Sequence, residues 1–100
     1  MFRHYLISGR VQGVGYRAFA LRTGVSIGIK GWVRNLHDHR VEAMIEGTEA
    51  QHSQFEQALR KGPAHSLVES VQSKIVDGPF VWENLSIAPN GENEWSHESS

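Results

Sequence analysis

The chain has 100 residues, enough for one domain with one hydrophobic core. Its 10 Lys and Arg residues against 11 Asp and Glu residues give a formal net charge of −1, so we expect no nucleic-acid binding and no binding to an anionic membrane. Cysteine is absent, which excludes disulfides, thiol catalysis and cysteine-based zinc sites. No apolar run approaches the ~20 residues of a membrane span, and we expect a cytoplasmic protein.

The first predicted elements are a strand at residues 2–8 and a helix at residues 16–27, separated by a glycine-rich loop. The loop, residues 9–15, contains three glycines, which let the backbone curl so that successive N–H groups point inward. The unpaired N–H groups at the start of the helix would face the same space. The loop and the helix start together are therefore a candidate anion cradle.

Arg17 lies in the first turn of this predicted helix, where the positive end of the helix dipole disfavours a cation. Its placement makes physical sense chiefly when an anion lies between the two positive elements. The alternative is an exposed arginine after a flexible turn. From the loop alone, the two interpretations carry equal weight.

Residues 30–36 and 40–46 are predicted to form a hairpin around the turn at residues 37–39. In the second strand, apolar side chains at alternate positions imply one buried face. His37 and His39 stand two residues apart in the turn, but a metal site needs three or four converging ligands. We therefore expect a solvated turn and no bound metal.

A second helix is predicted to begin at Thr48 and to stop at Gly62-Pro63, since Thr48 and Gln51 fit a capping box. An acidic residue near its start and basic residues near its end match the helix dipole, so these charges need no ligand. Beyond this helix we expect strands at residues 67–76 and around residues 85–87.

Residues 89–100 are polar and carry three glutamates, and we expect a tail that does not pack against the domain of residues 1–88. Trp95 in this tail has no explanation in the sequence. The predicted order of elements is that of the ferredoxin-like α+β sandwich (βαββαβ), in which two helices cover one face of an antiparallel sheet. The fifth strand would add to an edge or continue another strand, and the fold alone decides no chemistry.

The loop GRVQGVGYR at residues 9–17 and the segment GWVRN ending in Asn35 make the chain resemble the acylphosphatase family. The resemblance covers about residues 2–87, and two ordered motifs at the family's spacing are far more specific than either alone. It implies an enzyme that hydrolyses small acyl phosphates to a carboxylate and phosphate without a metal or a cofactor. We expect it to act as a monomer.

The resemblance also implies roles by position in the motifs: Arg17 binds the phosphate and Asn35 orients the attacking water. Main-chain N–H groups of the loop would wrap the phosphoryl oxygens, and they belong to Gln12, Gly13, Val14, Gly15 and Tyr16. These roles fit the chemistry, since phosphoryl transfer depends on preorganised positive charge. A carboxylate leaving group, whose conjugate acid has a pKa of about 4, departs without a general acid.

Three alternatives are weaker. Residues 13–18 fit a dinucleotide-binding fingerprint, but that site needs a parallel strand and further βαβ units. A non-catalytic phosphate-binding module of ferredoxin-like fold, or a relative of the domains within larger carbamoyl-transfer maturation proteins, would keep the same cradle. The presence of both Arg17 and Asn35 favours the enzyme over the binding module and over the maturation-protein relative. An RNA-binding version of the fold lacks its basic and aromatic signature.

The main departure from the family pattern is His39, where the hairpin commonly has glycine. A positive φ at this position would cost a histidine about 1 kcal/mol. We therefore expect His39→Gly to be neutral or stabilising.

Overall fold

The computed structural model describes residues 1–92, so Trp95 and the rest of residues 93–100 lie outside the described residues. The described chain contains the two helices and four strands of the ferredoxin-like prediction, together with the fifth strand that was also expected. In chain order the elements are β1 (Phe2–Arg10), α1 (Tyr16–Ile27), β2 (Lys30–Asn35), β3 (Val41–Glu46), α2 (Glu49–Lys61), β4 (Leu67–Val76) and β5 (Leu85–Ile87).

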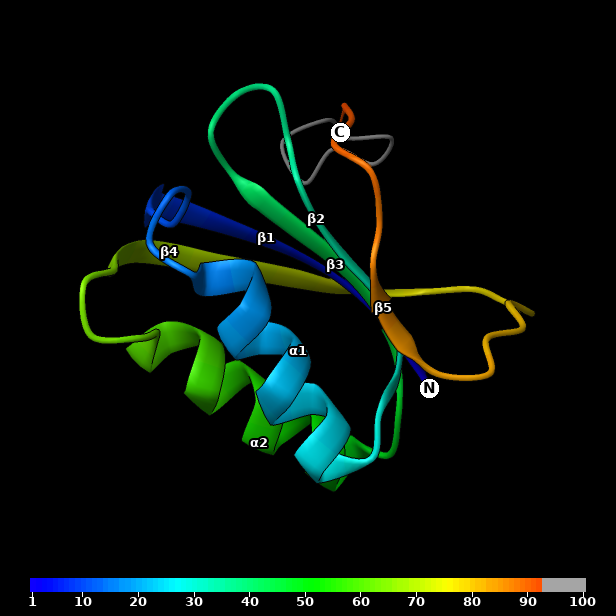
Figure 1. Ribbon diagram of the computed structural model, residues 1–100. Helices are drawn as coiled ribbons and strands as arrows, with labels where there is room; N and C mark the ends of the chain where they lie inside the picture. The colour runs from blue at the N-terminus through cyan, green and yellow to red at the C-terminus, as the bar shows by residue number, and fades with distance from the viewer. Residues whose placement is uncertain (93–100) are drawn as a thin grey trace.

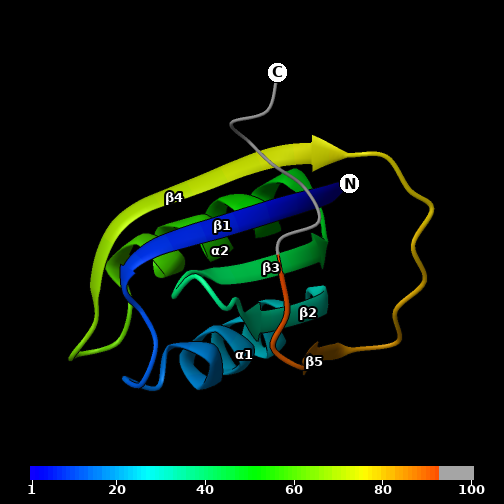
Figure 2. The ribbon, with the colours of Figure 1, turned by 90° about the horizontal axis from the view of Figure 1, so that it is seen from above.

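The five strands form one sheet in the order β4-β1-β3-β2-β5, with both helices on one face (Figure 1). The first four are antiparallel, and Tyr5 of β1 lies opposite Ala43 of β3 on one side and Ser73 of β4 on the other. β5 runs parallel to β2 at the outer edge, so the complete sheet is mixed. Figure 2 shows the chain between β4 and β5 crossing one end of the sheet to reach that edge. The fifth strand is thus an edge addition, one of the two predicted possibilities.

The core lies between the sheet and the two helices. Every second residue of the central strands points into it, because successive side chains of a strand face opposite sides. A fully buried aliphatic or aromatic side chain contributes about 1.5–3 kcal/mol to the free energy of unfolding. The core is built from side chains of all the major elements, among them Tyr5, Ile7, Tyr16, Ala20, Val33, Val41, Ala43, Ile45, Phe55 and Leu59.

Gly24 explains how α1 can lie close to the sheet edge. It is buried within the helix, and a Cβ added there would overlap the side chain of Leu85 in β5. A glycine costs helix stability of about 1 kcal/mol relative to alanine, and here the close approach of helix and strand requires it. The contact places β5 next to the first helix, which carries the glycine-rich loop at its other end.

α2 begins with the predicted capping box. The Thr48 hydroxyl accepts a hydrogen bond from the Gln51 backbone N–H (3.1 Å), and the Gln51 side-chain oxygen accepts one from the Thr48 N–H (2.9 Å). The first turn contains Glu49 and the last turn contains Arg60 and Lys61, which suit the helix dipole. Neither α1 nor α2 is long and apolar enough to cross a membrane, and these are the helices of the described chain.

The first residues of the predicted tail lie against β2. Gly91 donates its N–H to the backbone oxygen of Asn35 (3.1 Å) and accepts a hydrogen bond from the N–H of His37 (3.0 Å). We expected no packing from Pro89 onward, but β2 continues past β5 and leaves backbone groups that this segment pairs with. The division of the chain between residues 88 and 89 remains a prediction.

Candidate active site

A cavity of about 200 Å³ lies where the glycine-rich loop, the start of α1 and the end of β2 meet. It brings together the two predicted motifs, which are far apart in the sequence. Its lining residues are Val11, Gln12, Gly13, Gly15, Tyr16, Arg17, Ala18, Asn35 and Ile87. Val14, the remaining predicted loop residue, packs its side chain against the core. That position agrees with a role through its backbone.

The loop takes the shape that its glycines allow. Gly13 and Gly15 have φ angles of 73° and 76°, in the left-handed region that L side chains rarely adopt. Gly15 is also the N-cap of α1, and no side chain of the described chain caps this helix end. The first turn contains no acidic residue. The helix therefore presents uncapped N–H donors and the positive end of its dipole beside the cavity.

Arg17 adds a full positive charge to this end of the helix. It is half-buried and lines the cavity. Its Nη1 donates a hydrogen bond to Oδ1 of Asn90, at 3.4 Å. A guanidinium offers several donors in a fixed planar arrangement, which matches the oxygens of a phosphoryl group. Helix end and side chain thus act on the cavity with the same sign of charge.

Asn35 is the last residue of β2 and is only 8% exposed. Its Oδ1 is buried and has no hydrogen-bond partner among the described residues. A buried acceptor left unpaired costs about 1–3 kcal/mol, so a water that donates to it is favoured. Asn35 also lines the cavity, which places this residue beside the cradle.

The Gln12 side chain connects the loop to the hairpin. Its Nε2 donates to the backbone oxygens of Leu36 and Arg40, both at 2.9 Å. Leu36 directly follows Asn35, so this side chain fixes the loop relative to the end of β2. The sequence predicted only a main-chain role for Gln12, because both acceptors lie more than 20 positions away in the chain. No local pattern points to that contact.

The hairpin turn has the predicted strained residue. His39 is the non-glycine residue with a positive φ, 74°, in the described chain. The Asp38 carboxylate accepts hydrogen bonds from the Arg40 side chain, and these bonds lower the pKa of Asp38. Within residues 1–92, no group of three or more His, Asp or Glu side chains is placed to hold a metal ion.

Tyr16 lines the cavity but contributes its side chain to the core. Its hydroxyl donates to the backbone oxygen of Leu59 at 2.7 Å, and burial raises the pKa of the phenol above its usual range. The ring is therefore neutral and held in place. Tyr16 can act on a ligand only through its main chain.

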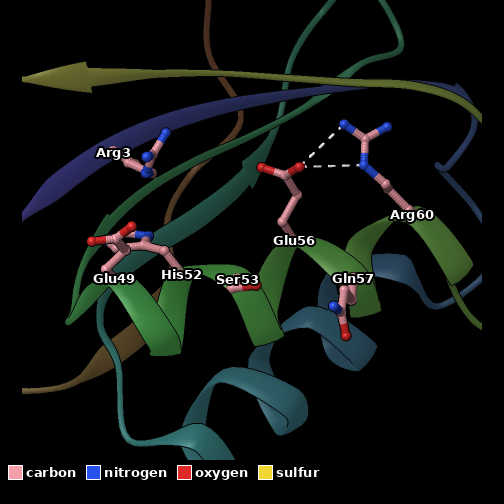
Figure 3. Close-up of a pocket in the computed structure, with 7 residues that line it drawn as sticks. All are labelled: Arg3, Glu49, His52, Ser53, Glu56, Gln57 and Arg60. Carbon is pink, nitrogen blue, oxygen red and sulfur yellow. Dashed lines mark hydrogen bonds and ion pairs between the residues drawn. The ribbon is translucent and has the colours of Figure 1, made fainter.

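A second hollow, of about 330 Å³, lies along α2 and is shown in Figure 3. Glu56 forms an ion pair with Arg60 at 3.2 Å there, and Arg60 also donates to the backbone oxygen of Val71. His52 is bonded at both ring nitrogens, to the Tyr5 hydroxyl and to the backbone oxygen of Met1. The charges of this hollow are mixed in sign, and the ion pair of Glu56 with Arg60 agrees with the predicted structural role of the charge at the end of α2.

Comparison with known proteins decides the family. A family model described as acylphosphatase matches residues 3–79. The chain belongs to the acylphosphatase family. The acylphosphatase of Syntrophotalea carbinolica is 47% identical over 76 residues, which are 74% of this chain and 83% of the relative. That of Azorhizobium caulinodans is 43% identical over 85 residues, or 85% of this chain and 91% of the relative.

Solved structures agree with this assignment. The crystal structure of an acylphosphatase from Bacillus subtilis superposes with a TM-score of 0.83 at 31% identity, covering 88% of this chain and 99% of that one. A structure of full-length HypF has the same TM-score, 0.83, at 26% identity, and covers 93% of this chain but 12% of its own. The predicted family, fold and enzyme class, a hydrolase of the acylphosphatase type, are confirmed.

Proposed function

We propose that this acylphosphatase-family enzyme hydrolyses the carboxyl–phosphate bond of acyl phosphates in the cavity between the glycine-rich loop and the end of β2. One observation carries the proposal: this cavity is lined by Arg17, by the uncapped start of α1 and by Asn35, whose buried Oδ1 has no hydrogen-bond partner among the described residues. An anion and a water molecule are the two ligands that this set of groups suits.

The phosphoryl group binds to the loop and to Arg17. Its negatively charged oxygens accept hydrogen bonds from the backbone N–H groups of residues 12–17 and from the guanidinium. In phosphoryl transfer, charge spreads over the three equatorial oxygens in the transition state. Donors that already point at those positions stabilise this charge without reorganisation. Arg17 and the helix end supply the positive charge that Mg²⁺ supplies in other phosphoryl-transfer enzymes.

The water molecule donates a hydrogen bond to Oδ1 of Asn35. This bond directs a lone pair of the water oxygen at the phosphorus. As the new P–O bond forms, the bond to the acyl oxygen breaks and the carboxylate leaves as an anion. The water's proton passes to a phosphoryl oxygen. A neutral amide suits this position, because an aspartate would add negative charge beside the phosphate.

The substrate class follows from the size of the cavity. A volume of about 200 Å³ accommodates a phosphoryl group and leaves the acyl part outside, so the site recognises the end that all acyl phosphates share. The net charge of −1 supports a small-molecule substrate without nucleic-acid or membrane partners. We place the enzyme in the cytoplasm as a monomer that needs no metal or cofactor.

A non-catalytic phosphate-binding module is the second candidate. The similar full-length HypF structure was solved in a phosphate- and nucleotide-bound form, and this fold makes up a small part of it. The cradle around Arg17 would serve binding alone equally well. The position of Asn35 favours the enzyme, because a binding module has no use for an acceptor that holds water beside the phosphorus.

The test is hydrolysis of benzoyl phosphate in the presence of EDTA, with Arg17→Ala and Asn35→Ala. Both variants should lose about 10²-fold in kcat, the scale for one preorganised stabilising group. Arg22→Ala and Asn84→Ala are the matched controls, because both side chains are exposed and neither lines the cavity. A folded native chain that binds phosphate through Arg17 without turnover would be the binding module instead.

A further inference from the structure

The residues after β5 continue along β2 until they reach the active site. Ala88 donates its N–H to the backbone oxygen of Val33 at 2.8 Å, and Gly91 pairs with Asn35 and His37 as described above. Figure 1 shows this segment, in orange, running from β5 alongside β2. We call residues 88–92 the C-terminal strap. It lies beyond the 3–79 range that the family model matches.

A buried charge network anchors the far end of the strap. Arg34 donates from Nη2 to the backbone oxygen of Glu92 (2.8 Å) and from Nε to the carboxylate of Glu42 (2.7 Å). Glu42 is fully buried and also lies 2.7 Å from Nε2 of His4. Hydrogen bonds between charged groups are shorter and stronger than neutral ones. Glu42 therefore holds the Arg34 side chain in place, and Arg34 in turn holds the end of the strap through the backbone oxygen of Glu92.

Asn90 lies between the two anchored parts of the strap, and its Oδ1 accepts the hydrogen bond from Nη1 of Arg17 at 3.4 Å. The same short segment thus contacts the backbone of Asn35 and the side chain of Arg17. We propose that Asn90 is a positioning residue: it orients the Arg17 guanidinium beside the cavity before the phosphoryl group binds. The inference rests on the proposed role of Arg17.

The chemistry of an amide suits this task. An arginine side chain has many rotamers, and binding a phosphoryl group with a pre-oriented side chain loses less conformational entropy. A neutral acceptor makes a modest hydrogen bond, which the guanidinium can exchange for the stronger bond to a phosphoryl oxygen. An aspartate at position 90 would form an ion pair with Arg17 and repel the incoming anion.

The experiment compares the native chain with Asn90→Ala and Asn90→Asp in benzoyl phosphate turnover and in competitive inhibition by inorganic phosphate. Asn90→Asp should raise KM and the phosphate inhibition constant about fivefold, as one exposed charge pair does, with kcat changed less than about twofold. Asn90→Ala should lower kcat/KM about two- to threefold, since it removes the orienting acceptor without adding charge. Asn84→Asp, which adds the same charge at the other end of β5, should match the native chain.

A merely structural role predicts another pattern. Both Asn90 variants would then lower the melting temperature and leave the phosphate inhibition constant unchanged. That result, or kinetics equal to those of the native chain in both variants, would overturn the inference. A native chain without turnover would count against the proposed function only. In that case phosphate binding by calorimetry would still test Asn90, with Asn90→Asp expected to bind about fivefold more weakly than the native chain.

Discussion

The two helices of this fold begin in opposite ways. α2 begins with a capping box between Thr48 and Gln51, and its first turn carries the acidic Glu49. α1 begins at Gly15, which has no side chain, and its first turn carries Arg17 and no acidic residue. The start of α2 is therefore capped by side chains of its own sequence and has an acidic residue beside the positive end of its dipole. The start of α1 has no side-chain cap among the described residues, and the proposed phosphoryl group would bind there.

This difference separates stability from function within one small domain. Residues around the start of α2 should affect the free energy of unfolding and leave catalysis unchanged. Arg17, in the first turn of α1, should affect catalysis, and its replacement should leave stability unchanged or improved. Substitutions at the starts of the two helices, measured for both stability and catalysis, can confirm or contradict this separation.

The largest expected effect is that of Arg17→Ala on catalysis. Turnover of benzoyl phosphate should fall about 10²-fold, because a preorganised charge is lost. The free energy of unfolding in the absence of phosphate should stay the same or rise by up to about 1 kcal/mol, since a cation in the first turn opposes the helix dipole. Kinetics and urea denaturation of the same preparation check both. A variant that is inactive because it is destabilised would break the comparison.

Thr48→Ala should show the reverse behaviour. Loss of the cap should lower the free energy of unfolding by about 1 kcal/mol and leave kcat/KM within about twofold of the native value. Thr48→Ser keeps the hydroxyl and is the matched control, with stability close to native. Urea denaturation measures the first effect and benzoyl phosphate hydrolysis the second. Equal loss of activity in both variants would contradict the assignment of this end to stability.

His39→Gly sharpens the comparison at the hairpin that follows Asn35. The residue has a φ of 74°, so glycine should relieve strain and raise the free energy of unfolding by up to about 1 kcal/mol. The gain is partly offset because glycine also has more freedom in the unfolded chain. Thermal denaturation checks the sign, and His37→Gly, in the same turn, is the control. A lower melting temperature for His39→Gly would contradict this prediction.

The smallest effect is the pH dependence that His52 gives to the α2 region. Burial lowers the pKa of His52, helped by the positive charge of Arg3 and opposed by the hydrogen bond to the Met1 backbone oxygen. The unfolded chain therefore binds the proton at a higher pH than the folded chain. This contribution to stability is complete above about pH 6.5 and decreases as the pH falls below that value. His52→Gln should flatten the decrease, whereas the exposed His37→Gln should not.

The sequence predicted features whose atoms lie close together in the chain. The capping box at Thr48, the left-handed loop glycines and the positive φ of His39 all depend on a few neighbouring residues. The pairing of Arg17 with Asn35 was predicted because two motifs of one family occur in order. The structure adds that they line the same cavity.

Features that depend on contacts across the fold were not predictable. Gln12 donates to backbone oxygens of a distant hairpin, and His52 bonds to the Tyr5 hydroxyl of β1 and to the backbone oxygen of Met1. Nothing in the composition of the polar C-terminal segment indicated that Gly91 pairs with β2 or that Asn90 reaches Arg17. In each case a polar group finds its partner only after the sheet has formed.

The central claim is that the open start of α1, together with Arg17, is an anion site. The most direct measurement is the melting temperature with and without inorganic phosphate, for the native chain, Arg17→Ala and Thr48→Ala. We predict that phosphate raises the melting temperature of the native chain and of Thr48→Ala by the same amount, and has little effect on Arg17→Ala. An equal rise in all three, or no rise in the native chain, would contradict the claim.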